Sequence, residues 1–200
     1  MRKPDEINAS ENIEFLRKAK KIFFVAMKAE LDEESTSSQV VFTGVGKARA
    51  TRAIVKYVFE HQDLFKSTDA PVIVSLGTAG SAKFNKGEII LVDNFFNNGD
   101  NFIREQISFD TLPCPTGRVC GSSDFFVGPE NFSQDKIQAM HEQFDCMDME
   151  SFALANVCKQ LGIRFCAAKC ISDGADNTVS NFDEELPRFR AILNEFAGSL

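Results

Sequence analysis

The chain has 200 residues, with 22 Lys or Arg against 29 Asp or Glu, which gives a formal net charge of −7. A chain of this length forms one domain by default, with a core large enough to be stable without disulfides or metal. Hydrophobic residues make up 44% and charged residues 26%, and this composition excludes extensive disorder. The acidic balance argues against a nucleic-acid-binding protein, because such a protein needs a basic face.

Targeting and redox features point to a cytoplasmic protein. No stretch approaches the roughly 18 consecutive apolar residues that a membrane-spanning helix requires, so we expect no membrane association. The N-terminal segment alternates charges and has no apolar core, unlike a secretory signal. The six cysteines include no Cys-x-x-Cys pair. We therefore expect buried free thiols in a reducing compartment rather than disulfides or a zinc site.

Taken in chain order, apolar runs alternate with segments of helical spacing. The first helix is expected over residues 8–20, with Asn8 or Ser10 as its cap. Predominantly apolar segments are typical of strands buried on both faces, and they lie at residues 22–27, 40–43, 72–76, 88–92 and 163–171. Further helices are expected over residues 47–61, 147–161 and 182–198, the second of them capped by Asp148. Residues 28–38 are expected to form a loop, 77–81 a small-residue turn, and 94–132 the least regular part of the chain.

This alternation predicts the fold class. A strand, a helix and a second strand over residues 40–76 form a βαβ unit, whose crossover should be right-handed. Repeated along the chain, the pattern predicts a three-layer α/β/α sandwich around a mixed, mostly parallel central sheet. Since we find no internal repeat and no long linker, residues 1–200 are expected to form a single domain.

Ligands of open α/β sheets bind beyond the carboxyl ends of the strands. Five segments are expected there: residues 27–30, 43–46, 77–81, 122–127 and 172–176. Gly44 and Gly46 could begin a Gly-x-Gly-x-x-Gly dinucleotide-binding motif, but Arg49 occupies the position of its third glycine. Taken alone, the two glycines therefore predict only a tight turn. The chain has only two histidines, too few to make a histidine-based zinc site or catalytic triad a reasonable prediction, so we expect no metal.

Carboxylates are the remaining chemical groups at this edge. Glu30, Glu150, Asp173 and Asp176 each lie at or just past the end of an apolar segment. One such residue alone is typical of a helix cap or a solvated end. Several together suit hydrolysis through a cationic sugar transition state, which needs one carboxylate for water, one for the leaving group and one for the sugar hydroxyls.

Four motifs carry a resemblance to a known family. They are Gly-Val-Gly-Lys-Ala at 44–48, Ser-Leu-Gly-Thr-Ala-Gly at 75–80, Asp-Met-Glu-Ser-Phe-Ala at 148–153 and Ile-Ser-Asp-Gly-Ala-Asp at 171–176. Together they resemble the nucleoside phosphorylase/nucleosidase superfamily, most closely the 5'-methylthioadenosine/S-adenosylhomocysteine nucleosidases. The resemblance covers residues 21–198 and leaves the N-terminal helix outside. Loops near 28–38 and 115–123 are shorter than is usual in the family, so the chain looks like a shortened member.

The resemblance implies a role for each matched residue. Asp173 would donate a proton towards purine N7, and Glu30 would orient and deprotonate the attacking water. Glu150 would bind the ribose hydroxyls, with Met149 packed beneath the sugar. Phe126 would stack on the base, where such stacking contributes about 1–3 kcal/mol.

The remaining matched residues complete the implied binding site. The backbone of Val127 would bind the adenine edge, and Phe182 would line the pocket for the 5' substituent. Substrate contacts are also expected for the following residues: Met27, Thr78, Lys169 and Ser172. Two of these depart from the family pattern, because Thr78 replaces a serine and Lys169 replaces an arginine, which loses the planar fork of that side chain.

The matched residues favour hydrolysis over phosphorolysis. The phosphorylases of this superfamily hold phosphate with arginines, and Ser75 stands where one of them would be. Two alternatives stay open: a phosphate-dependent purine nucleoside phosphorylase, and a catalytically idle nucleoside-binding or storage protein. The resemblance implies no cofactor, a small-molecule nucleoside as partner, no nucleic acid, and a homodimer.

Overall fold

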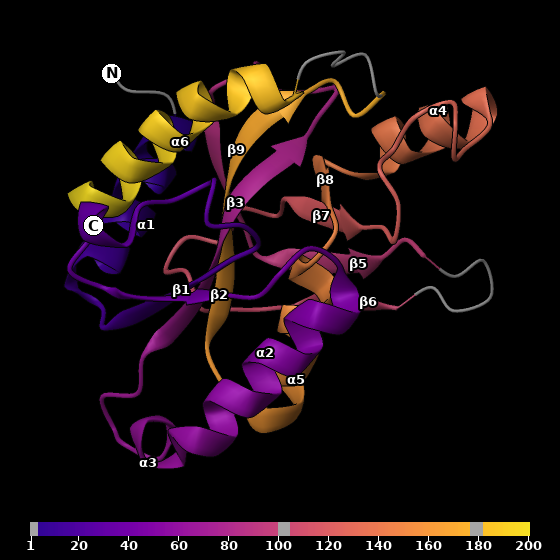
Figure 1. Ribbon diagram of the computed structural model, residues 1–200. Helices are drawn as coiled ribbons and strands as arrows, with labels where there is room; N and C mark the ends of the chain where they lie inside the picture. The colour runs from indigo at the N-terminus through magenta and orange to yellow at the C-terminus, as the bar shows by residue number, and fades with distance from the viewer. Residues whose placement is uncertain (1–3, 100–104, 177–181) are drawn as a thin grey trace.

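The structure is a computed structural model that describes residues 4–99, 105–176 and 182–200 (Figure 1). Within these ranges nine strands form one sheet. The strands are β1 (Lys21–Val25), β2 (Gln39–Phe42), β3 (Val72–Gly80), β4 (Ile89–Val92), β5 (Asn94–Asn97), β6 (Gln106–Ser108), β7 (Val119–Ser122), β8 (Cys146–Asp148) and β9 (Phe165–Asp173). The helices are α1 (Pro4–Lys18), the short 3-10 helix η1 (Glu33–Ser35), α2 (Lys47–Glu60), α3 (Gln62–Phe65), α4 (Gln134–Gln143), α5 (Ser151–Leu161) and α6 (Phe182–Ser199).

The sheet is mixed and mostly parallel, as the sequence predicts. Parallel pairing joins β2 to β1, β1 to β3 and β3 to β9, and β4 then pairs antiparallel with β9. The end of β3 also pairs antiparallel with β8, through Gly80 and Met147. From β8 the sheet continues in parallel through β7 to β5, and β6 closes it in the antiparallel sense. Strand β3 therefore connects the two parts of the sheet.

Helices cover both faces of the sheet (Figure 1). On one face, α2 and α5 pack together, and α2 buries a stripe of helical spacing formed by Ala50, Ile54 and Tyr57. On the other face, α1 and α6 pack against the sheet through Leu16 and Phe189. Helix α4 lies apart from both layers, where it forms a smaller apolar cluster next to β8. No helix of the described residues is long and apolar enough to cross a membrane.

Two boundaries near the predicted site were wrong. Strand β3 continues to Gly80, so residues 77–80 are extended strand rather than a turn. Small residues are needed there for space, because a Cβ at Gly80 would lie 2.6 Å from the Asp173 carboxylate. The helix expected from residue 147 begins at Ser151, because residues 146–148 form strand β8.

The region expected to be irregular, residues 94–132, contains three short strands, β5, β6 and β7. Each has only three or four residues, and these include Asn, Gln, Gly and Ser. Their pairing with β8 and with one another supplies the order that local sequence does not predict. All six cysteines are free, and five of them are buried, as expected.

Candidate active site

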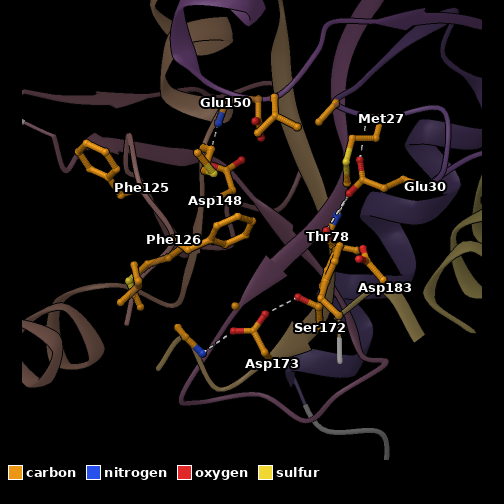
Figure 2. Close-up of a pocket in the computed structure, with 18 residues that line it drawn as sticks. Met27, Glu30, Thr78, Phe125, Phe126, Asp148, Glu150, Ser172, Asp173 and Asp183 are labelled. Atoms are coloured by element: carbon orange, nitrogen blue, oxygen red, sulfur yellow. Dashed lines mark hydrogen bonds between the residues drawn. The ribbon is translucent and has the colours of Figure 1, made fainter. Parts of the chain in front are cut away.

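A cavity of about 410 Å³ lies beyond the carboxyl ends of β1, β3, β7, β8 and β9 (Figure 2). All five segments that the sequence places at this edge contribute to its wall. Of the residues predicted for the site, the following line the cavity: Met27, Glu30, Thr78, Phe126, Val127, Met149, Glu150, Ser172, Asp173 and Phe182. Lys169 and Asp176 are not among the lining residues.

Glu30 is only 2% exposed, and three hydrogen-bond donors hold its carboxylate in one orientation. One carboxylate oxygen accepts hydrogen bonds from the Thr78 amide at 2.8 Å and the Thr78 hydroxyl at 2.7 Å. The other oxygen accepts the Met27 amide at 3.1 Å. Gly77 gives the carboxylate room, since a Cβ at that position would lie 3.1 Å from it. Contacts with Met27, in the loop after β1, and with Thr78 of β3 thus fix the position of the Glu30 carboxylate at the cavity wall.

Asp173 ends β9 and is held from its own turn. The Ser172 hydroxyl donates to one carboxylate oxygen at 2.6 Å, and the Ala175 amide donates to the other at 2.7 Å. The Asp173 carbonyl accepts the Ser81 amide at 2.8 Å, which ties the turn to the end of β3. These contacts keep the carboxyl group at the cavity wall opposite Glu150 (Figure 2).

Glu150 is the residue that precedes helix α5. Its carboxylate accepts the Gly46 amide at 2.6 Å, and Gly46 has φ +97°, a conformation that favours glycine. Burial, together with the negative charge of Asp148, raises the pKa of Glu150 to about 7. The ionisation state of this side chain therefore changes near neutral pH.

Lys169 forms a buried ion pair with Asp148 instead of lining the cavity. Its ammonium lies 2.9 Å from the Asp148 carboxylate, and the two side chains are 3% and 1% exposed. It also donates to the Ser75 hydroxyl at 3.1 Å. The position of Lys169 within β9 directs its ammonium to the charge of Asp148, so it does not line the cavity.

The ion pair determines the charge state of both partners. Burial alone would raise the pKa of Asp148, but Lys169 and hydrogen bonds from Ser122 and Ser151 outweigh it, so the pKa lies below its usual value. Burial alone would lower the pKa of Lys169, but Asp148 and other negative groups outweigh it, so the pKa lies above its usual value. Both side chains are therefore charged at neutral pH.

Two phenylalanines lie at the cavity with different orientations. The Phe126 ring points into the cavity, whereas Phe125 points away at the rim (Figure 2). Phe126 is 63% exposed, so one ring face is free to receive a planar group.

The sequence assigns no role in the site to eight of the lining residues: Ala26, Val45, Gly80, Phe125, Met147, Asp148, Ala175 and Asp183. Four of them, Val45, Gly80, Phe125 and Ala175, lie within the segments expected at this edge of the sheet. The prediction that Asp148 caps the following helix is wrong, because the N-cap of α5 is Glu150, although the Asp148 carboxylate accepts the Ser151 amide at 3.1 Å.

The lining of the cavity is acidic. Its carboxylates are Glu30, Asp148, Glu150, Asp173 and Asp183, and no described lining residue is a lysine or arginine. Within the described ranges, no group of three His, Cys, Asp or Glu side chains is arranged to hold a metal ion. Such a lining suits a neutral ligand with hydroxyl and ring N–H donors, and it opposes an anionic ligand.

Comparison with known proteins gives matches of two kinds. Residues 101–198 match the family model of the phosphorylase superfamily. A 5'-methylthioadenosine/S-adenosylhomocysteine nucleosidase from Actinobacillus succinogenes is 33% identical over 72 residues, which are 36% of this chain. The aligned segment spans 30% of that relative's length.

The second kind of match is structural. The Helicobacter pylori 5'-methylthioadenosine/S-adenosylhomocysteine nucleosidase with butyl-thio-DADMe-Immucillin-A superposes with a TM-score of 0.70 at 16% identity, covering 91% of this chain and 97% of that one. Native futalosine hydrolase from the same organism gives 0.69 at 16% identity, covering 92% and 97%. At these identities the likeness shows a shared fold, and the α/β sandwich is thereby confirmed.

Proposed function

We propose that the chain is a member of the phosphorylase superfamily, whose family model matches residues 101–198, and that it hydrolyses the N-glycosidic bond of an adenine nucleoside. The substrate would be 5'-methylthioadenosine or S-adenosylhomocysteine, as the name of the curated relative suggests. The observation that carries the proposal is the arrangement of Glu30, Glu150 and Asp173, which reach one cavity from three sides (Figure 2). Glycosidic hydrolysis uses one carboxyl group for the leaving group and another for the attacking water, and a third carboxylate can bind the sugar hydroxyls.

Asp173 would act on the leaving group. As the bond between C1' and N9 breaks, its electron pair moves into the purine, and the Asp173 carboxyl group donates its proton to N7. Adenine then leaves as a neutral molecule rather than an anion. Hydrogen bonds from the Ser172 hydroxyl and the Ala175 amide support this role, because they hold the carboxyl group in a fixed position.

Glu30 would act on the nucleophile. It would accept one proton of a water molecule whose oxygen forms the new bond to C1', so that the sugar gains a hydroxyl group. Its three hydrogen bonds with Met27 and Thr78 support this role, since a fixed carboxylate can orient water towards the sugar. The proton gained by Glu30 returns to solvent, and Asp173 is reprotonated from solvent before the next turnover.

The other lining residues would bind the parts of the nucleoside. Glu150 would accept hydrogen bonds from the ribose hydroxyls above Met149. Phe126 would stack on the base, and the backbone of Val127 would bind its edge. Phe182 would contact the 5' substituent.

The four other predicted site residues, Met27, Thr78, Ser172 and Lys169, would have supporting roles. Met27, Thr78 and Ser172 would border the substrate where they line the cavity, while they hold the two reacting carboxyl groups. Lys169 would act through its ion pair with Asp148.

Water is favoured over phosphate as the nucleophile. Phosphate requires cationic or multiple backbone donors, and no described residue that lines the cavity is cationic. Ser75 is buried and bonded to Lys169, whose charge is balanced by Asp148. An anion in this cavity would therefore face several carboxylates without compensation.

The proposal is tested by adenine release from 5'-methylthioadenosine, with and without inorganic phosphate. We expect equal rates in both conditions. Release that requires phosphate would assign the chain to the phosphorylases. Nucleoside binding without release in either condition would identify a binding protein on the same fold. Adenosine and S-adenosylhomocysteine, assayed in parallel, would rank the 5' substituents.

A further inference from the structure

Histidine 141 lies outside the cavity wall, yet it contacts the turn that carries Asp173. We propose that His141 is a positioning residue, which holds residues 172–175, here called the acid turn, in the conformation that presents Asp173. This inference rests on the proposed role of Asp173 as the proton donor.

The acid turn contains an unfavourable backbone conformation. Ala175 has φ +54°, and it is the single non-glycine residue with positive φ among those that the structure describes. Steric crowding of the Cβ atom disfavours this left-handed region for an L-residue, so surrounding contacts must maintain it. The same residue donates its amide to the Asp173 carboxylate at 2.7 Å. Relaxation of Ala175 would therefore move one of the two donors that orient Asp173.

Helix α4 supplies the contact that holds Ala175. The Nε2 atom of His141 lies 2.9 Å from the Ala175 carbonyl oxygen. Because a carbonyl oxygen can only accept, Nε2 carries the proton and donates. Thus the amide of Ala175 is bonded to Asp173, while its carbonyl is bonded to His141, and both sides of the residue are fixed.

Packing around this hydrogen bond supports the same role. Ile137 lies three residues before Met140 and four residues before His141, and this spacing puts all three on one face of α4. Both apolar side chains belong to the buried cluster that contains Ala175. Helix α4 thus presents one face to the acid turn, with His141 as its polar contact.

A second connection links the same two elements. The Ser81 amide donates to the Asp173 carbonyl, and the Ser81 hydroxyl donates to the carbonyl of Asp145 at 2.7 Å. Asp145 follows α4 by two residues. The helix and the acid turn are therefore joined both directly and through Ser81, which follows β3, while α4 itself contributes no residue to the cavity wall.

The test uses three substitutions of His141. His141→Ala removes the donor, and we expect kcat to fall about 10-fold to 100-fold with little change in KM, since misplacing a catalytic group affects the chemical step. His141→Gln should retain most of the activity, because a glutamine amide reaches about as far as Nε2. His141→Asn is polar but too short, and it should behave like alanine. The same histidine-to-alanine change at His61, which stacks on Tyr57 in α2, is the control and should leave kcat unchanged.

A double-mutant cycle separates positioning from general destabilisation. If His141 acts through Asp173, the effect of His141→Ala should vanish in the Asp173→Asn background. An unchanged kcat for His141→Ala, or a decrease of equal size in both backgrounds, would overturn the inference. If Asp173→Asn itself leaves kcat unchanged, the proposed function fails instead, so the two failures are distinguishable.

Discussion

At the scale of single residues, Asp173 and Glu30 have different tasks in the proposed reaction. Asp173→Asn keeps the shape of the side chain and one oxygen for the bonds at its turn, but it cannot donate an acidic proton to N7. We expect kcat for 5'-methylthioadenosine to fall by about 10²-fold to 10⁴-fold, measured by adenine release. Wild-type kcat in a folded variant would show that Asp173 is not the acid.

Glu30→Gln tests the complementary task. The amide retains the hydrogen-bond acceptor for Thr78 but is a poor base for water. We expect hydrolysis to be lost while nucleoside binding, measured by calorimetry, stays close to that of the wild type. Loss of binding as well would make Glu30 a residue that holds the ligand or the fold.

Glu150 predicts a pH dependence of binding. Its pKa is raised to about 7, so the carboxylate ionises as pH rises through neutrality. The ionised form accepts stronger hydrogen bonds from ribose hydroxyls, so affinity should increase with pH, by about fivefold to tenfold in total. The measurement is the Kd of 5'-methylthioadenosine for Asp173→Asn between pH 5.5 and 8.5. Adding Glu150→Gln should make the profile flat near pH 7, and a persisting rise would assign it to another group.

At the scale of elements, the ion pair between Lys169 and Asp148 connects β9 with β8 beneath the site. Lys169→Met leaves the Asp148 charge buried without its partner, and we expect a loss of about 3–5 kcal/mol in the free energy of unfolding, measured in urea. Lys56→Met removes one side of an exposed pair on α2 and should cost less than about 1 kcal/mol. Similar small losses for both variants would mean that the buried pair adds little to stability.

The positions of the proposed reactive carboxylates could be predicted from local sequence. Glu30 and Asp173 follow apolar runs that are long enough to define β1 and β9, and the edge rule for α/β sheets then places them together. Strand β3 was expected to end before Gly77, because Gly, Thr and Ala resemble a turn. Its extension depends on pairing with β9 and on the space needed by two carboxylates, which no local pattern encodes.

Other features could not be predicted because they depend on partners distant in sequence. A carboxylate three residues before the first turn of a helix is typical of a cap, so Asp148 gave no sign of its ion pair with a residue in β9. Likewise β5, β6 and β7 are too short and too polar to show strand periodicity. His141 belongs to no motif in the sequence, and only the fold brings it to Ala175.

At the scale of the whole molecule, exposed apolar side chains suit the homodimer that the family resemblance implies, and we propose that two copies associate. Val55 and Phe59 of α2 are 49% and 73% exposed, and Leu161 of α5 is 54% exposed. We expect a dimer by sedimentation, and Phe59→Glu should shift it towards the monomer, because a charge would be buried in the interface. Lys56→Glu on the same helix is the control for added negative charge. A monomeric wild-type protein would contradict this proposal.

Cleavage of a nucleoside by water in this acidic cavity is decided by the sugar product. The measurement is mass spectrometry of that product after the protein acts on 5'-methylthioadenosine in the presence of inorganic phosphate. We expect adenine and free methylthioribose in equal amounts. Methylthioribose 1-phosphate as the product would contradict this expectation.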